Sequence, residues 1–342
     1  MTQSDPCLEL LAKHSAKFST KSSLCLLPDG ATTSDFSFLE KSIFLTQRYD
    51  SYQEFIAADK SCFISDWDFS EIETELEVIY LRVPKEKAVV HHLINSAMRK
   101  LPINGKLILT GLRTDGIKTY IDKTKATFSA EAESFTTKTG ARLAIITKNS
   151  EPENFLDDQN YKWFQTIKKN RLNFVSKPGL FGWQQIDKGS ALLAETLNSD
   201  LIKDQTVLDL GCGYGYLSIV TSKLKPTSIT ATDNNATAIA AAKKNFAMHA
   251  IPGEVIIDNC AENIAQEFDL ILCNPPFHQN FKTESSLTDR FISSLHSHLK
   301  EDGELRVVVN AFIPFAQKAE ALFSEINCIK ETPQFKVFSL RK

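Results

Sequence analysis

Two short segments of the sequence combine residue types that could support group-transfer chemistry. The first is a glycine-rich turn at Asp209–Gly215 (DLGCGYG), and the second is Asn274–Phe277 (NPPF). Glycines let a ligand approach the backbone with no Cβ in the way. An asparagine followed by prolines offers amide and carbonyl oxygens that accept hydrogen bonds. The pair therefore indicates a bound cofactor next to a substrate that carries a planar amino group.

The spacing of the glycine turn favours S-adenosylmethionine as the cofactor, because it is GxGxG and not the GxGxxG of many dinucleotide sites. Asp209 lies two residues before the first glycine, where a carboxylate could attract the methionine ammonium group. Asp233 ends the next apolar strand, where a carboxylate can accept hydrogen bonds from both ribose hydroxyls. A third strand ends near Asp258, at the position expected beside the adenine. The predicted cofactor-binding residues are Asp209, Gly211, Cys212, Gly213, Gly215, Asp233, Asn234, Asp258, Asn259 and Asn274.

Each of these residues also has a purely structural interpretation. A glycine-rich turn alone is a weak signal, since nicotinamide and flavin enzymes use related turns. Asp233 could instead be a helix N-cap, and for Asp258 a structural role is as favoured as cofactor binding. All the segments nevertheless follow apolar strands, and open α/β sheets bind ligands at the carboxyl ends of their strands. This shared position favours one common cofactor site.

The Asn274–Phe277 loop predicts how the amino group is held. The Asn274 side chain and the Pro275 carbonyl supply two acceptors for the two hydrogens of a planar NH₂ group, so that its lone pair can point at the methyl donor. Phe277 offers a face for stacking a base. No strong general base is required because the amine becomes acidic once methylated, so catalysis is mostly positioning. The predicted catalytic residues are Asn274, Pro275, Pro276 and Phe277, and His278 either contacts substrate or caps the loop.

The second half of the chain alternates strand and helix patterns, which predicts an α/β fold with a mainly parallel sheet. The expected strands are Thr206–Leu210, Ser228–Thr232, Glu254–Ile257, Asp269–Cys273, Glu304–Val309 and Gln334–Leu340. The expected helices are Tyr216–Leu224, Ala236–His249, Leu287–Leu299 and Phe315–Ser324.

The first half contains a weaker echo of the same pattern. A strand at Glu77–Leu81, a helix at Glu86–Lys100 and a strand at Lys106–Thr110 match the segments around the NPPF loop in order and spacing. Arg82-Val83-Pro84 stands where that loop would be, and the glycine turn is missing. We therefore expect two tandem Rossmann-like class I methyltransferase domains, the N-terminal one degenerate and inactive, with chance similarity as the alternative.

The expected division is a degenerate domain at residues 1–160, a basic and aromatic linker at 161–178 and a catalytic domain at 179–342. The linker, YKWFQTIKKNRLNFVSKP, carries five cations and no acid. Basic groups can neutralise phosphates while aromatic faces stack on bases. Lys168, Lys169 and Arg171 are therefore predicted to bind an RNA substrate, and the alternative is a solvated segment whose aromatics lie in the core.

The bulk composition narrows the function classes further. The chain has 342 residues, 42% hydrophobic and 24% charged, with a net charge of -3, so any RNA contact must come from local patches. Its seven cysteines include no CxxC pair, which argues against a zinc site or a disulfide framework. No apolar run has the length of a membrane span or signal peptide, and we expect a cytoplasmic protein without a metal.

The sequence resembles the ribosomal RNA small-subunit (16S) guanine-N2 methyltransferase family. The resemblance rests on Asn274–His278 (NPPFH), Phe181–Ser190 (FGWQQIDKGS), Val308–Phe315 (VVNAFIPF) and Phe335–Val337 (FKV). It implies S-adenosylmethionine as cofactor and 16S rRNA or the small ribosomal subunit as partner. Separately from the resemblance, the sequence hides the oligomeric state, but a fused degenerate copy could replace a partner subunit, so we expect a monomer. By this resemblance, Asp209, Gly211, Gly213 and Asp233 hold the cofactor, and Asn274–Phe277 hold guanine.

Three alternatives remain open from the residues themselves. A sister family shares much of the loop and methylates a guanine of 23S rRNA. The same loop also serves adenine-N6 and protein glutamine methylation. A non-enzymatic ribosome-assembly factor that binds RNA is a different class, and the intact set of Asp209, Asp233 and Asn274 argues against it.

Overall fold

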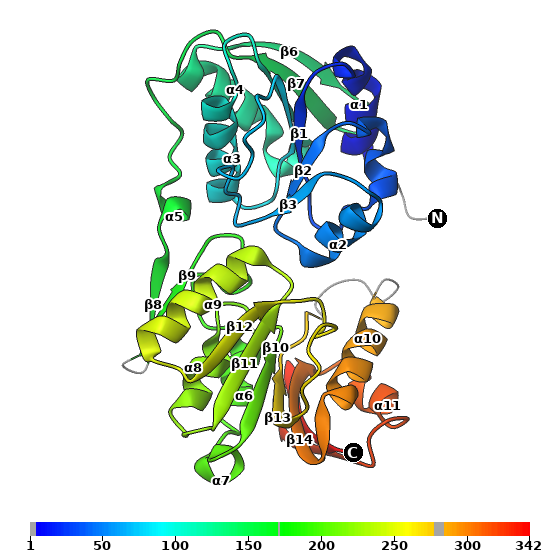
Figure 1. Cartoon of the computed structure of the whole chain (residues 1–342), viewed down its shortest axis with the longest axis vertical. Coiled ribbons are helices and arrows are strands. Elements are labelled where there is room, and N and C mark those ends of the chain that lie inside the picture. Colours follow the sequence, from blue (N-terminus) through cyan, green and yellow to red (C-terminus); the bar gives the residue numbers. More distant parts are fainter. Residues whose placement is uncertain (1–4, 170–171, 277–283) are drawn as a thin grey trace. The chain divides into compact units, whose positions relative to one another are not determined.

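A computed structural model describes residues 5–169, 172–276 and 284–342. The chain divides into two compact units, Met1–Trp163 and Phe164–Lys342, coloured blue to green and green to red in Figure 1. Each unit contains its own seven-stranded sheet, and the second also contains a separate two-stranded hairpin. Each unit is described separately below.

The first unit is a mixed sheet in the order β3-β2-β1-β4-β5-β7-β6. Strands β3, β2, β1, β4 and β5 run parallel, and β7 pairs antiparallel with both β5 and β6. The strands are β1 (Ser23–Leu26), β2 (Ile43–Thr46), β3 (Cys62–Ile64), β4 (Val78–Arg82), β5 (Lys106–Leu112), β6 (Glu131–Thr136) and β7 (Ala141–Thr147). The α-helices are α1 (Pro6–Ser15), α2 (Tyr49–Ala57), α3 (Lys87–Lys100), α4 (Ile117–Phe128) and the short α5 (Gln159–Lys162).

Alternation along the strands of this sheet builds two cores. Ile79 and Leu81 of β4 face α3 and α4, whereas Val78 and Tyr80 face α1 and α2. All four of these side chains are buried. Figure 1 accordingly shows α3 and α4 on one side of the sheet and α1 and α2 on the other.

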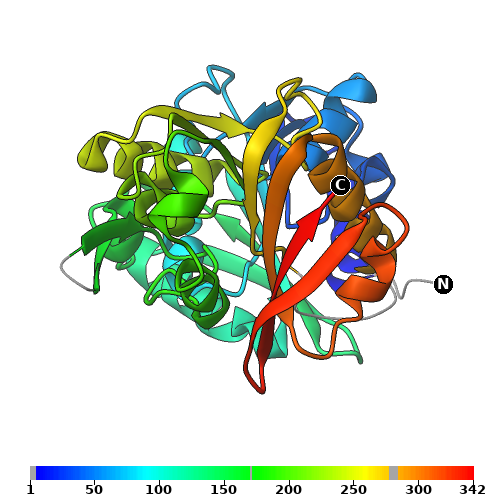
Figure 2. The same cartoon turned by 90° about the horizontal axis from the view of Figure 1, so that it is seen from below.

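The second unit is a mixed sheet in the order β12-β11-β10-β13-β14-β16-β15. Its strands are β10 (Thr206–Leu210), β11 (Ser228–Asp233), β12 (Gly253–Ile257), β13 (Phe268–Cys273), β14 (Leu299–Asn310), β15 (Glu325–Glu331) and β16 (Phe335–Arg341). Its helices are α6 (Lys188–Ala194), α7 (Ser199–Ile202), α8 (Tyr216–Ser222), α9 (Ala236–His249), α10 (Glu284–Ser297) and α11 (Phe315–Ala319). In Figure 2 the red C-terminal strand β16 lies beside the orange β14, with which it pairs antiparallel.

The second sheet is also covered on both faces. Helices α6, α8 and α9 pack on the face that carries Val207 and Leu272, and α10 and α11 pack on the face that carries Leu208 and Cys273. Side-chain caps mark the start of two of these helices, α6 and α9. Asp187 caps α6 through the Ser190 amide, and Asn235 caps α9 through two amides of its first turn.

The two sheets have the same strand order when each is counted from its own first strand. Strands β1–β7 correspond in sequence order to β10–β16, and both sheets read third, second, first, fourth, fifth, seventh, sixth. Helix α1 then corresponds to α6, because each precedes the first strand and packs on the same face. The expectation of two tandem Rossmann-like domains is confirmed, with β4 and β5 equivalent to β13 and β14.

The segment predicted as a linker contains an antiparallel hairpin, β8 (Gln165–Lys169) with β9 (Leu172–Ser176), that belongs to the second unit. Tyr161 and Phe174 are buried, so neither ring is available to stack on a base. Lys177 is also buried and lies over the Phe164 ring. Lys168 remains exposed. The basic and aromatic surface is therefore smaller than the sequence suggested.

Three further details differ from the predicted elements. β15 was not predicted, because its side chains are mostly exposed and give no clear apolar pattern. The helix expected at Phe315–Ser324 ends at Ala319. The helix expected at Leu287–Leu299 ends at Ser297, and Leu299 already belongs to β14.

Candidate active site

The glycine turn connects β10 to α8, and its three alternating glycines all lie in the left-handed region. Gly211, Gly213 and Gly215 have φ of 74°, 56° and 86°, where a side chain would be strained. A Cβ at Gly211 or Gly213 would meet no atom within 4 Å, whereas at Gly215 it would approach Ala242 of α9. The first two glycines thus border open space, as a ligand cradle requires, and the third allows α8 to pack against α9.

Asp233 holds the turn in shape from the end of β11. Its carboxylate accepts a hydrogen bond from the Gly213 amide at 2.8 Å and another from the Asn235 amide at 2.9 Å. The amides of Gly211 and Cys212 both donate to the Thr232 carbonyl at 2.9 Å. The carboxylate is therefore fixed beside the turn, in the position predicted for a ribose-binding group.

Asp209 is buried beneath the turn, with 1% of its surface exposed. One carboxylate oxygen accepts hydrogen bonds from the Ser218 amide at 2.9 Å and the Ser218 hydroxyl at 2.6 Å. The pKa of Asp209 is raised to about 6, mainly by burial; the Ser218 hydrogen bonds oppose this shift and the charge of Asp233 adds to it. A cation bound nearby would restore the ionised form.

The third strand's loop is also ordered by its own side chains. Asp258 is buried and accepts hydrogen bonds from the Asn259 amide and from the backbone and side chain of Asn263. The Asn234 side chain donates to the Asn259 oxygen at 3.2 Å. These contacts give Asp258 a loop-building role, and Asn234 and Asn259 lie at the same edge of the sheet.

The segment that begins at Asn274 starts at the same edge, one strand away from the glycine turn. Leu210 pairs with Cys273, so the next residues, Gly211 and Asn274, leave neighbouring strands side by side. The Asn274 amide nitrogen donates to the Asp187 carboxylate at 2.9 Å and to the Ser190 hydroxyl at 2.7 Å. Within the described residues, no donor reaches the Asn274 side-chain oxygen. That oxygen is therefore the acceptor available to a substrate.

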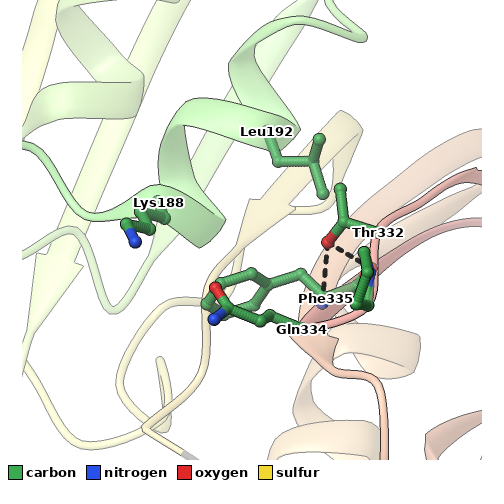
Figure 3. Close-up of a pocket in the computed structure, with 6 residues that line it drawn as sticks. Lys188, Leu192, Thr332, Gln334 and Phe335 are labelled. Carbon is green, nitrogen blue, oxygen red and sulfur yellow. Dashed lines mark hydrogen bonds between the residues drawn. The ribbon is translucent and has the colours of Figure 1, made fainter.

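A pocket of about 270 Å³ opens beside the residues that hold Asn274. It lies between the start of α6 and the β15–β16 turn, and Figure 3 shows the side chains of the two elements facing each other. Phe335 packs against Gly189, where a Cβ would come within 3.2 Å of the ring and 3.0 Å of the Asp187 carboxylate. The pocket is lined by an aromatic ring, aliphatic groups, an amide and a cation, from Lys188, Leu192, Thr332, Pro333, Gln334 and Phe335.

The predicted site residues do not all come together. The structure gathers Gly211, Gly213, Asp233 and Asn274 along one sheet edge, with Pro275 buried and Pro276 exposed behind Asn274. Phe277, His278 and Arg171 lie outside the described residues. Lys168 is on the hairpin strand β8, as is the backbone of Lys169.

Sequence reasoning did not assign roles to Asp187, Ser190 or Phe335. Asp187 and Ser190 lie in the DKGS segment and Phe335 in the FKV segment, both noted only as family-like. Their position beside Asn274 follows from tertiary structure, because α6 and β16 are far from β13 in the sequence. The signal available was the pattern Asp-x-Gly-Ser, typical of a capped helix start.

The same places in the first unit hold different residues. Leu26 pairs with Leu81 in the first unit as Leu210 pairs with Cys273 in the second. The residues that come next therefore correspond: Leu27 takes the place of Gly211, and Arg82 takes the place of Asn274. Arg82 forms ion pairs with Asp5 at 3.2 Å and Asp115 at 2.5 Å. An arginine bound to two carboxylates replaces the acceptor amide, which agrees with a degenerate copy.

Each unit matches a known protein family. Residues 171–339 match the family "Methyltransferase small domain", and residues 9–142 match "Methyltransferase small domain N-terminal". The chain is 31% identical over 263 residues to Ribosomal RNA small subunit methyltransferase C of Photorhabdus laumondii, covering 76% of this chain and 75% of that protein. It is 29% identical over 335 residues to the protein of the same name from Actinobacillus succinogenes, covering 97% and 98%.

A solved structure has the same fold over nearly the whole chain. It is described as the T. thermophilus 16S rRNA N2 G1207 methyltransferase (RsmC) in complex with AdoMet and guanosine. The TM-score is 0.83 at 20% identity, with 99% of this chain and 92% of that chain covered. Among the described residues of the present chain, no helix has the length and apolar character needed to cross a membrane.

Proposed function

The chain belongs to the ribosomal RNA small subunit methyltransferase C family, and we propose that it transfers a methyl group from S-adenosylmethionine to the N2 amine of a guanine in 16S rRNA. The observation that carries the proposal is the oriented amide of Asn274 beside the glycine turn. It places a hydrogen-bond acceptor for an amine next to a cradle for the methyl donor. The related T. thermophilus enzyme acts on G1207, and we propose the corresponding guanosine as the target.

The cofactor fits the residues at the sheet edge. Gly211 and Gly213 border open space, and Asp233 carries a fixed carboxylate for the ribose hydroxyls. Asp209 would supply negative charge toward the methionine ammonium group through its buried position. S-adenosylmethionine, when bound, supplies an electrophilic methyl group on a sulfonium.

The protein's own part in the reaction is to hold and orient the amine. The Asn274 side-chain oxygen and the Pro275 carbonyl accept the two N2 hydrogens. With both hydrogens held, the lone pair is directed at the methyl group for in-line displacement. No side chain needs to remove a proton first, because the nitrogen loses its proton to water after it has been methylated.

The pocket beside α6 is the proposed entry for the flipped base. A purine could stack on Phe335, while the Gln334 amide contacts its polar edge and Lys188 contacts a phosphate. Such a pocket is needed because a base in a helix cannot reach the sheet edge without leaving the stack. Phe277 and His278 are proposed to contribute from the loop that follows Pro276.

The first unit is proposed to support RNA binding without catalysis, and the β8–β9 hairpin to add Lys168, Lys169 and Arg171 to that contact. The division into residues 1–160, 161–178 and 179–342 remains the proposed functional arrangement. A monomer that acts in the cytoplasm without a resident metal is part of the same proposal.

The test is a methylation assay on small ribosomal subunits and on naked 16S rRNA prepared without the modification. Mass mapping of the product should show one N2-methylguanosine, formed by the wild type and lost in Asn274→Ala, which should still bind S-adenosylmethionine. N6-methyladenosine, a methylated 23S guanine or methylated glutamine would replace the proposal by one of the alternatives. Full activity of Asn274→Ala would remove the loop from the mechanism.

A further inference from the structure

The orientation of the Asn274 amide is determined by its neighbours. An ionised carboxylate only accepts hydrogen bonds, so the Asn274 atom that lies 2.9 Å from Asp187 must be the nitrogen. The second hydrogen of that nitrogen is directed to the Ser190 hydroxyl at 2.7 Å. Both amide hydrogens are therefore used inside the protein, and the side-chain oxygen has to point away from Asp187.

The position of Asp187 is itself fixed by the start of α6. The same carboxylate oxygen that accepts from Asn274 also accepts from the Ser190 amide at 2.8 Å, as the N-cap of the helix. Gly189 directly precedes Ser190, and a Cβ on Gly189 would be 3.0 Å from this oxygen. In the sequence Asp-x-Gly-Ser, one Asp187 oxygen thus accepts both the capping bond from the helix and the bond from the Asn274 amide. The glycine position has no space for a larger side chain.

The degenerate unit contains the same link with a different partner. Asp5 caps α1, the equivalent of α6, through the Cys7 amide at 2.8 Å. Its carboxylate also bonds the Arg82 side chain at 3.2 Å, and Arg82 occupies the place of Asn274. In both units, the aspartate that caps the first helix thus bonds the residue at the end of the equivalent strand, β4 in one unit and β13 in the other. Of the two partners, asparagine has a side-chain oxygen that can accept a hydrogen bond, whereas arginine has donors alone.

We propose that Asp187 and Ser190 are positioning residues for the methyl transfer. They hold Asn274 with its oxygen toward the substrate amine, and the Asp187 charge makes that oxygen a stronger acceptor as positive charge develops on the nitrogen. A charged partner roughly doubles the strength of a hydrogen bond. This inference rests on the proposed function for its substrate, but its geometric part concerns Asn274 alone.

The first experiment separates positioning from helix capping. Asparagine caps helices as well as aspartate, so Asp187→Asn keeps the helix start and removes only the charge. We expect kcat to fall on the order of tenfold, with the Kd for S-adenosylmethionine and the Tm unchanged. Ser190→Ala should lower kcat in the same way. Asp5→Asn is the matched control, and it should leave kcat unchanged while lowering stability through its lost ion pair with Arg82.

The second experiment exchanges the two side chains. Asn274→Asp alone sets two carboxylates against each other and should be nearly inactive. Combined with Asp187→Asn, it restores one amide donor and one carboxylate acceptor, and still leaves an oxygen for the substrate. The double variant should exceed Asn274→Asp by at least about tenfold, since one restored charge-assisted bond is worth that much. A double variant no better than Asn274→Asp, or Asp187→Asn at wild-type kcat, overturns the inference.

A measurement without RNA keeps the two proposals apart. In nitrogen-15 spectra the Asn274 side-chain amide should show two protected hydrogens in the wild type, and one should lose protection in Ser190→Ala. Rapid exchange of both hydrogens in the wild type overturns the positioning role, whatever the substrate. Protected hydrogens in a wild type that methylates no 16S rRNA would overturn the proposed function and leave the geometry standing.

Discussion

Replacement of Gly211 by alanine tests the cofactor cradle against a control inside the same chain. Gly211 follows β10, and Gly30 lies in the loop after β1, the equivalent strand of the degenerate unit. Their φ angles are 74° and 71°, and a Cβ would meet no atom within 4 Å at either position. The two substitutions therefore impose nearly the same backbone strain and differ only in what occupies the open space.

The magnitudes follow from this match. A left-handed alanine costs about 1–2 kcal/mol, and the loss of unfolded-chain entropy offsets about 0.4–1 kcal/mol of it. Each variant should lose about 1 kcal/mol, which lowers the Tm of a unit of this size by roughly 2–4 °C. At Gly211 the new methyl group would also enter the space of the cofactor. Overpacking of about 1–3 kcal/mol then weakens the Kd roughly 5- to 150-fold.

Calorimetric titration with S-adenosylmethionine and a thermal melt measure both effects. We expect Gly211→Ala and Gly30→Ala to have similar melting temperatures, with weakened cofactor binding in Gly211→Ala only. Wild-type affinity in Gly211→Ala would refute the cradle. Equal loss of affinity in both variants would mean that the effect comes from stability and not from a clash.

Three other perturbations give separate tests. Burial raises the folded-state pKa of Asp209 from 3.8 to about 6, so the fold favours the protonated carboxyl over the ionised one. The protonated carboxyl therefore contributes its full stability below about pH 4, and this contribution is lost as the pH rises through 6. Asp209→Asn should therefore gain up to about 3 kcal/mol relative to wild type between pH 4 and 7.5 in urea unfolding, and a constant difference would contradict the shift. Phe335→Ala should raise the KM for RNA about tenfold, the effect of one lost base stack, without changing the Kd for the cofactor, and wild-type KM would exclude the pocket. Arg82→Ala should cost about 2 kcal/mol because Asp5 and Asp115 lose their charged partner but keep their backbone hydrogen bonds. It should still leave one cofactor site per chain by calorimetry, whereas a second site would show that the first unit is not degenerate.

Much of the catalytic unit was predictable because its signals are local. An apolar run identifies a buried parallel strand, so strand Thr206–Leu210 was predicted with the observed limits. The alanine-rich segment Ala236–His249 was likewise predicted as a helix with the observed limits, because alanine favours helix. The glycine turn and the two prolines constrain the backbone through their own covalent structure. β15 has no such signal, since exposed edge strands lack a clear pattern of burial.

The sequence by itself determined which chemical groups this protein has and which strand ends carry them. It identified Asp209, Asp233 and Asn274 and, through the echo in the first half, the two-unit architecture. Only the tertiary structure decided how these groups are oriented. The Asn274 amide is oriented by Asp187, the N-cap of a helix that is distant in sequence, and burial keeps the Tyr161 and Phe174 rings from the role in RNA binding that the sequence predicted for them. The physical reason is that residue type sets which hydrogen bonds a group can make, whereas the direction of an amide or ring depends on partners that folding brings together.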